Sequence, residues 1–241
     1  MSALEPFAYA HDGLKLSGRL ARPVGPGPHP AILVMHSALG PDQQTGERAQ
    51  DLAKLGYVAL ATDLYGLGPA GPDLDYMPLF QQYQEQPDLL RGRILAGYEA
   101  LRELPEVDAG RIGAIGYCFG GQCVLELART GADVRSVVSF HGLLRTARPA
   151  QPGTVKAHML VLTGAKDPFV PEEDVRRFQE EMTGAEADWQ LTIYGEGYHS
   201  FTAPEAAKLN LEGIRYDPLL DRLSWAQATA FLDATLNGAA I

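Results

Sequence analysis

The sequence predicts an α/β fold in which helices cover both faces of a mostly parallel, twisted sheet. The first observation is that short apolar runs alternate with amphipathic segments along the chain. The second is composition: 241 residues, 46% apolar and 21% charged, are typical of a globular protein with a substantial core. No repeat, low-complexity tract or change of composition marks a boundary, so we expect residues 1–241 to form a single domain.

Compact apolar or β-rich runs predict the strands, and segments with helical periodicity predict the helices between them. The expected strands are Leu14–Leu20, Ala31–Met35, Val58–Thr62, Ile112–Gly116, Ser136–Phe140, Met159–Thr163 and Gln190–Tyr194. The expected helices lie near Glu47–Leu55, Leu89–Leu104, Gly121–Arg129, Glu172–Met182 and Ser224–Leu236. Two longer connections, Gly66–Gln86 and Phe201–Asp221, are candidate walls of a ligand pocket, because long loops of α/β folds often lie at the ligand end.

Charge and cysteine content limit the possible partners and compartment. A net charge of −10 argues against nucleic acid, since binding a phosphate backbone needs a basic face. Two cysteines, Cys118 and Cys123, are too few for a disulfide framework and suit a reducing compartment. The first residues lack the features of a signal peptide, and the apolar runs are too short to cross a bilayer. We therefore expect a cytoplasmic protein that does not bind membranes.

The most informative segment is 116–121, with sequence GYCFGG, which follows a predicted strand and opens a predicted helix. Glycine two positions before and two positions after Cys118 permits a very tight strand-to-helix turn. Such a turn projects the cysteine away from the sheet and places its sulfur at a helix N-terminus, which favours thiolate. The backbone N–H of Phe119 can then point at a developing oxyanion.

Other interpretations of this turn are less favourable. A glycine-rich turn can cradle a phosphate, but neither the G-x-G-x-x-G nor the G-x-x-x-x-G-K-[ST] pattern is present. A lone cysteine is usually a small buried apolar residue. The spacing of the glycines favours a nucleophile for Cys118, whereas Cys123 lies inside the predicted helix and is expected in the core.

An acid and a base follow the cysteine in the order that the α/β-hydrolase fold uses. Asp167 comes just after the strand Met159–Thr163, and His199 lies in a glycine-rich loop after the strand Gln190–Tyr194. His199 is expected to take the proton of Cys118, and Asp167 to fix the imidazole tautomer. The sulfur would attack an acyl carbon and form a thioester. The remaining histidines show no metal-ligand spacing, so we expect no metal and no cofactor.

These residues resemble the dienelactone hydrolase family. The matching segments are 116–121 (GYCFGG), 164–168 (GAKDP), 198–201 (YHSF), 56–58 (GYV), 63–66 (DLYG) and 221–225 (DRLSW). They spread over nearly the whole chain, from about residue 30 to about residue 230. The resemblance implies an α/β-hydrolase fold of about eight strands. It also implies a monomer or weak homodimer that acts on a small-molecule ester or lactone.

The resemblance also implies details of the site. The second oxyanion donor would be the backbone N–H of Ala38, in the turn after the strand Ala31–Met35. In the family a glutamate in this turn helps to activate the cysteine. Here the matching position is Ser37, and Glu47 further along does not replace it, so His199 is expected to activate the thiol alone.

Substrate contacts depart from the family pattern as well. The family binds a substrate carboxylate with arginines, one of them shortly after the histidine, but no arginine follows His199 closely. Arg91 is then a candidate carboxylate partner, or simply a solvated helix charge. Aromatic residues are candidate walls of an apolar acyl pocket beside Ser37, with core packing equally open: Tyr65, Phe80, Tyr83 and Phe201.

The leading hypothesis is a cysteine-dependent hydrolase of carboxylic esters or lactones. A peptidase or thioesterase would use the same triad, because an acyl-enzyme serves all of these reactions. A binding or regulatory protein that has kept the fold is an alternative from a different class. A redox pair is the weakest alternative, because Cys118 and Cys123 do not have C-x-x-C spacing.

Overall fold

The computed structural model describes residues 3–66, 75–205, 208 and 211–238. Its strands form one eight-stranded sheet in the order β1-β2-β4-β3-β5-β6-β7-β8. The strands are β1 (Leu4–His11), β2 (Leu14–Ala21), β3 (His29–Met35), β4 (Val58–Ala61), β5 (Val107–Tyr117), β6 (Ser136–Phe140), β7 (His158–Gly164) and β8 (Trp189–Tyr194). β2 is antiparallel to β1 and to β4, and the pairs from β4 to β8 are parallel.

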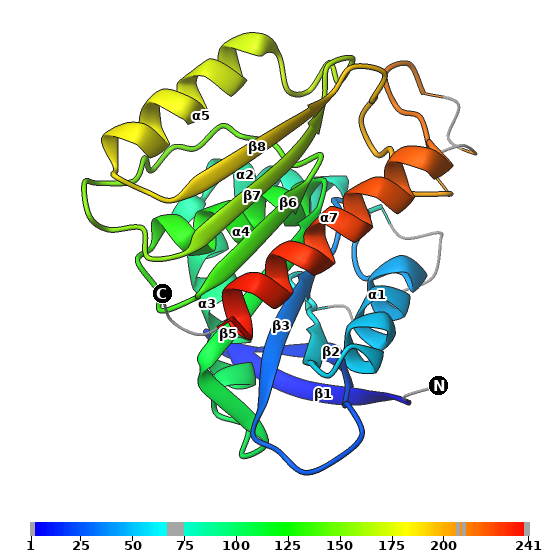
Figure 1. The fold of residues 1–241 in the computed structure, drawn as a ribbon, viewed down its shortest axis with the longest axis vertical. Coiled ribbons are helices and arrows are strands. Elements are labelled where there is room, and N and C mark those ends of the chain that lie inside the picture. The colour runs from blue at the N-terminus through cyan, green and yellow to red at the C-terminus, as the bar shows by residue number, and fades with distance from the viewer. Residues whose placement is uncertain (1–2, 67–74, 206–207, 209–210, 239–241) are drawn as a thin grey trace.

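Helices cover both faces of the sheet, as Figure 1 shows. The helices are α1 (Gln43–Lys54), α2 (Met77–Glu85), α3 (Pro87–Arg102), α4 (Phe119–Arg129), α5 (Glu172–Gly184) and α7 (Pro218–Leu236). Apolar side chains of α1 and α7 pack in one core cluster, and those of α2 to α5 pack in another. The fold class expected from the sequence, an α/β-hydrolase sheet with helices on both faces, is confirmed.

The predicted strands all coincide with strands of the sheet, but β1 is absent from the prediction. β1 is an edge strand with a mostly exposed or half-buried surface, and it contains Pro6, so its apolar alternation is weak. It pairs with β2 through a turn at Asp12 and Gly13, where φ is 47° and 76°. An Asp-Gly pair is a typical hairpin signal.

Helix α1 begins four residues before the predicted start at Glu47. Asp42 precedes the helix, and its Oδ1 accepts a hydrogen bond from the backbone N–H of Thr45 at 2.8 Å. The predicted connection Gly66–Gln86 contains α2, and residues 67–74 of that connection lie outside the described residues. None of the helices within the described ranges is long and apolar enough to cross a membrane.

The parallel strands β3 to β8 bring six chain segments to one edge of the sheet. Met35 of β3 pairs with Gly116 of β5, and Gly164 of β7 pairs with Tyr194 of β8. The turns that follow β3, β4, β5, β6, β7 and β8 therefore leave the sheet side by side, at the carboxyl ends of the strands. This edge is where α/β sheets bind ligands.

Candidate active site

Cys118 occupies a strained turn between β5 and α4. Its backbone has φ 55° and ψ −115°, a conformation that L-residues rarely adopt and that costs about 1–3 kcal/mol. The turn is possible because the residues two positions before and two positions after Cys118 are glycines, which have no side chain. A Cβ on Gly116 would lie 2.0 Å from the carbonyl oxygen of Gly120, and a Cβ on Gly120 would lie 2.2 Å from that of Met35. The glycine spacing of the sequence thus has a direct steric cause.

Three residues far apart in the sequence form one hydrogen-bonded line at this edge. Nε2 of His199 lies 3.1 Å from Sγ of Cys118, and Nδ1 of His199 lies 2.8 Å from Oδ2 of Asp167. The Asp167 side chain is fully buried, and its Oδ1 accepts the backbone N–H of Phe169 at 2.8 Å. The aspartate is thereby held with one oxygen facing the imidazole.

Backbone hydrogen bonds fix the loop that carries His199. The N–H of His199 donates to the carbonyl of Gly213 at 3.0 Å, and its own carbonyl accepts from Arg215 at 3.0 Å. The loop that carries Asp167 is tied to the same segment, because the N–H of Lys166 donates to the carbonyl of Gly197 at 2.9 Å. Asp167 and His199 are therefore positioned by the main chain as well as by each other.

The environment shifts the pKa of both Cys118 and His199. Burial raises the pKa of the Cys118 thiol, but the hydrogen bond and charge of His199 and the N–H groups of Ala38 and Phe119 outweigh it, so the pKa falls below its usual value. Burial lowers the pKa of His199, but hydrogen bonds to Asp167 and Cys118 outweigh that effect and raise it to about 10. Together these shifts favour a thiolate–imidazolium pair.

The turn after β3 presents the backbone N–H of Ala38 to the Cys118 sulfur. Nδ1 of buried His36 donates to the carbonyl of Ser37 at 2.7 Å, while its Nε2 accepts the N–H of Leu64 at 3.1 Å. The hydroxyl of Tyr65 donates to the carbonyl of Ala38 at 3.1 Å. These bonds fix the turn, so the Ala38 N–H is held in place before any substrate binds.

A cavity of about 260 Å³ opens beside Cys118 and His199. Its lining is mainly apolar and comprises Ser37, Ala38, Leu39, Met77, Phe80, Cys118, Leu143, Phe169, His199, Ser200, Leu211 and Ile214. Ser37 and Phe80, two of the residues expected near a substrate, thus line the cavity. Leu143 and Phe169 line it too without having been expected from the sequence, although each follows closely on a strand end at the same edge.

Other expected substrate contacts lie away from this cavity. Phe201 is 0% exposed and packs against His141 and Tyr194 in the core, because its side chain points to the face of the sheet that α7 covers. Tyr65 is buried behind the turn of Ala38. Tyr83 is also buried, and its hydroxyl donates to the carbonyl of Leu64 at 2.6 Å. None of the three lines the cavity.

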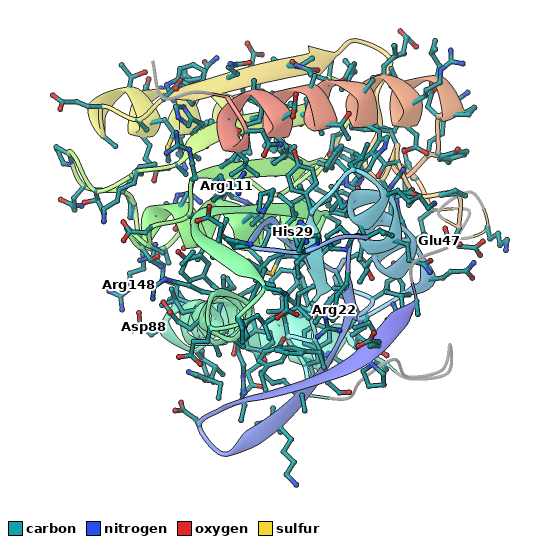
Figure 2. All side chains as sticks on the ribbon, turned by 60° about the horizontal axis from the view of Figure 1, so that its bottom comes forward. Arg22, His29, Glu47, Asp88, Arg111 and Arg148 are labelled. Atoms are coloured by element: carbon teal, nitrogen blue, oxygen red, sulfur yellow. The ribbon has the colours of Figure 1, made fainter. Side chains whose placement is uncertain are left out.

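The charged side chains of Arg91 and Glu47 contact other residues and do not line the cavity. Arg91 on α3 forms a 2.8 Å ion pair with Glu126 on α4 and does not line the cavity. Glu47 is exposed on the outer side of α1, where its carboxylate accepts a hydrogen bond from Gln43, as its place in Figure 2 illustrates. Within the described part of the chain, no group of three His, Cys, Asp or Glu side chains is arranged to hold a metal ion.

The eight-stranded sheet, with a sharp cysteine turn after β5, defines a protein of the α/β-hydrolase class. The chain belongs to the dienelactone hydrolase family, whose model matches residues 16–236, and it is an ester-bond hydrolase. The family expected from the sequence is thus confirmed.

Two relatives illustrate the similarity. A probable 2-oxo-3-(5-oxofuran-2-ylidene)propanoate lactonase from Bradyrhizobium sp. is 34% identical over 195 residues, which cover 76% of this chain and 77% of the relative. A crystal structure of a dienelactone hydrolase-like promiscuous phosphotriesterase from metagenomic libraries is 32% identical, with a TM-score of 0.89, covering 97% of this chain and 98% of that one.

A more distant structure shares only the fold. An acylaminoacyl peptidase from Pyrococcus horikoshii is 16% identical, with a TM-score of 0.72, and the match covers 99% of this chain and 43% of that one.

Proposed function

We propose that this protein hydrolyses carboxylic esters and lactones through a thioester on Cys118. The observation that carries the proposal is the line from Asp167 through His199 to Cys118, with distances of 2.8 Å and 3.1 Å, beside an apolar cavity. A nucleophile, a base and an orienting carboxylate in hydrogen-bond contact are the arrangement that acyl transfer requires.

In the first half of the reaction, the Cys118 thiolate attacks the ester carbonyl carbon and a C–S bond forms. The carbonyl π electrons move to oxygen, which takes the hydrogen bonds that the N–H groups of Ala38 and Phe119 make to sulfur. When the tetrahedral intermediate collapses, the C–O bond breaks and the leaving oxygen takes the proton from Nε2 of His199. In a lactone the leaving oxygen stays attached to the acyl chain, so the ring opens.

In the second half, neutral His199 removes a proton from water, and the resulting hydroxide attacks the thioester carbonyl. The C–S bond breaks, the acid leaves and the thiolate–imidazolium pair forms again. Asp167 stabilises the positive imidazolium in both halves and keeps Nδ1 protonated, so that Nε2 always faces the sulfur.

The test compares wild type with Cys118→Ala and His199→Ala on 4-nitrophenyl acetate, δ-valerolactone, an acyl thioester and an aminoacyl anilide. We expect wild type to hydrolyse the ester and the lactone, and each variant to lose this activity. Acid-quenched wild type should carry the acyl mass on the peptide containing Cys118. The matched control is Cys123→Ala, because Cys123 is fully buried and burial raises its pKa well above the usual value.

Full activity in Cys118→Ala would refute the proposal. Hydrolysis of the anilide alone would indicate a peptidase, and hydrolysis of the thioester alone a thioesterase. No turnover of any of these substrates, with slow alkylation of Cys118, would favour a binding protein that has kept the fold.

A further inference from the structure

The chemical character of the cavity beside Cys118 bears on which substrates can enter it. Beyond the reacting residues, its lining is dominated by the side chains of Leu39, Met77, Phe80, Leu143, Phe169, Leu211 and Ile214. Ser37 and Ser200 are the polar side chains of the lining apart from Cys118 and His199. Among the described residues that line it, none is a lysine or an arginine.

The cations that are nearest to the lining in sequence have other contacts. Lys208, three residues before Leu211, pairs with Glu205 at 2.6 Å on the surface. Lys166, next to Asp167, pairs with Glu196, and Nζ of Lys166 lies 5.8 Å from the centre of the Tyr198 ring. The guanidinium of Arg215, which follows Ile214, lies 5.7 Å from the centre of the same ring. Two residues after Leu143, Arg145 pairs with Asp174 at 3.3 Å.

Arg91 and Arg148, which lie further along the chain from the lining residues, are also paired. Arg91 forms its ion pair with Glu126, and Arg148 pairs with Asp88 at 2.7 Å on the outer surface, where both are labelled in Figure 2. The segments 67–74, 206–207 and 209–210, which the structure does not describe, contain no lysine or arginine in their sequence. The net charge of −10 further disfavours the approach of anions.

The imidazolium of His199 is a positive charge in the lining itself, but both of its N–H groups already have hydrogen-bond partners. Its two nitrogens contact Asp167 and Cys118, so it has no free N–H for a substrate carboxylate. A carboxylate that enters an apolar cavity loses the favourable free energy of its hydration. Without a cationic partner, its contacts in the cavity offset little of that loss. An alkyl chain in the same place gains about 25 cal/mol for each Å² of apolar surface that it buries.

Building on the proposed hydrolase function, we infer that this site takes uncharged esters with an apolar acyl chain and discriminates against acyl groups that carry a carboxylate. The cavity of about 260 Å³ favours a short or medium chain, because pockets for drug-sized ligands span roughly 300–1,000 Å³. Among the described residues, the proposed reaction chemistry is thus combined with a cavity lining that offers no lysine or arginine to an anionic substrate.

The test uses two substrates that differ in one terminal group. In 4-nitrophenyl hexanoate the acyl chain ends in a methyl group, and in the mono-4-nitrophenyl ester of adipic acid a carboxylate replaces that methyl group. For wild type we expect kcat/KM to be larger for the hexanoate by at least about 30-fold, since the unpaired carboxylate is poorly solvated in the cavity.

A second experiment adds a positive charge to the lining, which should weaken the preference for the uncharged ester. Leu143→Arg places a guanidinium in the lining, and we expect it to shift the hexanoate-to-adipate ratio of kcat/KM towards the adipate ester by at least about tenfold. Leu143→Met is the matched control, because it keeps an apolar side chain of similar size and should retain the wild-type ratio.

The outcomes separate this inference from the proposed function. If wild type cleaves the adipate ester as efficiently as the hexanoate, and Cys118→Ala loses both activities, the substrate inference is overturned while the cysteine mechanism stands. If hexanoate hydrolysis survives in Cys118→Ala, the cysteine mechanism itself fails. The hexanoate-to-adipate ratio of kcat/KM in wild type tests the substrate inference even if Leu143→Arg does not fold, and Cys118→Ala tests the cysteine mechanism.

Discussion

The backbone nitrogen of Cys118 lies 3.2 Å from Nδ1 of His141, and this contact links the turn of Cys118 to the loop that carries His199. The same N–H also donates to the carbonyl of Phe140 at 3.0 Å. Because Nδ1 accepts, Nε2 carries the proton and donates to the hydroxyl of Thr202 at 2.8 Å. Thr202 is three residues beyond His199, and the two histidine rings lie 5.3 Å apart. Burial, followed by the charge of His199, holds the pKa of His141 well below its usual value, so its ring stays neutral.

We therefore expect His141 to act as a positioning residue, and His141→Phe tests this role. Phenylalanine fills the space but removes both hydrogen bonds, each worth about 1 kcal/mol. The expected result is a fall in kcat of about tenfold with little change in KM, since the cavity lining is unaffected.

The control is His141→Gln, which offers an amide oxygen to Cys118 and an amide N–H to Thr202. This variant should recover most of kcat. Equal losses in both variants, in proportion to a loss of thermal stability, would show that His141 serves only to fill the core.

The pH dependence of alkylation reports the state of Cys118. Since His199 favours the thiolate, the Cys118 thiol should ionise at a lower pH than an ordinary cysteine. The rate of alkylation by iodoacetamide should therefore reach half its maximum below the ordinary thiol value of about pH 8.5. In His199→Gln the imidazolium is lost, so the midpoint should move upward. A midpoint unchanged between wild type and His199→Gln would contradict the thiolate–imidazolium pair. Cys123 should stay unmodified in both proteins, because burial raises its pKa.

Ester hydrolysis should show a bell-shaped pH profile. The rising limb follows ionisation of Cys118 below its usual pKa, and the falling limb follows loss of the proton from His199 at about pH 10. Above that pH no proton remains on Nε2 for the leaving oxygen. Single-turnover acylation rates measured from pH 5 to 11 would check both limbs, and continued acceleration beyond pH 10 would exclude His199 as the acid.

Tyr65→Phe tests how the turn after β3, which carries Ala38, is kept in its conformation. The substitution removes the hydrogen bond to the carbonyl of Ala38 and leaves the ring packing intact. We expect kcat to fall severalfold, up to about tenfold, because one hydrogen bond of about 1 kcal/mol no longer orients the Ala38 N–H. Steady-state kinetics would measure this, and a change confined to KM would instead indicate direct contact with substrate.

The residues that sequence patterns place best are those whose spacing has a steric or topological cause. Gly116 and Gly120 are required by the cysteine turn, and the strand ends before Asp167 and His199 meet at one edge in any parallel sheet. The same reasoning applies to His141, directly after β6, but an isolated histidine carries no spacing signal. Its importance depends on a contact with the backbone of Cys118, which appears only in three dimensions.

The direction in which a side chain points is not predicted by these sequence patterns. Phe201 is two residues from His199, yet it points into the core, because the loop turns at Ser200, where φ is 59°. Arg91 is indistinguishable from a solvated helix charge in the sequence, and its partner Glu126 comes from a different helix. Long-range contacts of this kind decide which candidates reach the cavity.

A buried ion cluster behind α4 offers a prediction about stability that is separate from catalysis. The side chain of Arg129 is fully buried and pairs with Glu126 at 3.0 Å and with Glu181 at 2.8 Å. Arg129→Met leaves Glu126 buried with one fewer cation, which should lower the free energy of unfolding by about 3–5 kcal/mol. Urea denaturation followed by circular dichroism would measure this change.

Catalysis should survive in the same variant, because Arg129 is at the far end of the 11-residue helix α4, about 16 Å along its axis from Cys118. At low urea concentration the folded variant should keep near-wild-type kcat on 4-nitrophenyl acetate. The matched control is Arg176→Met, which breaks an exposed ion pair with Glu180 and should leave the urea midpoint close to that of wild type. If both variants unfold at the same urea concentration as wild type, the buried cluster contributes nothing to stability, and the rigidity of α4 must come from its apolar packing alone.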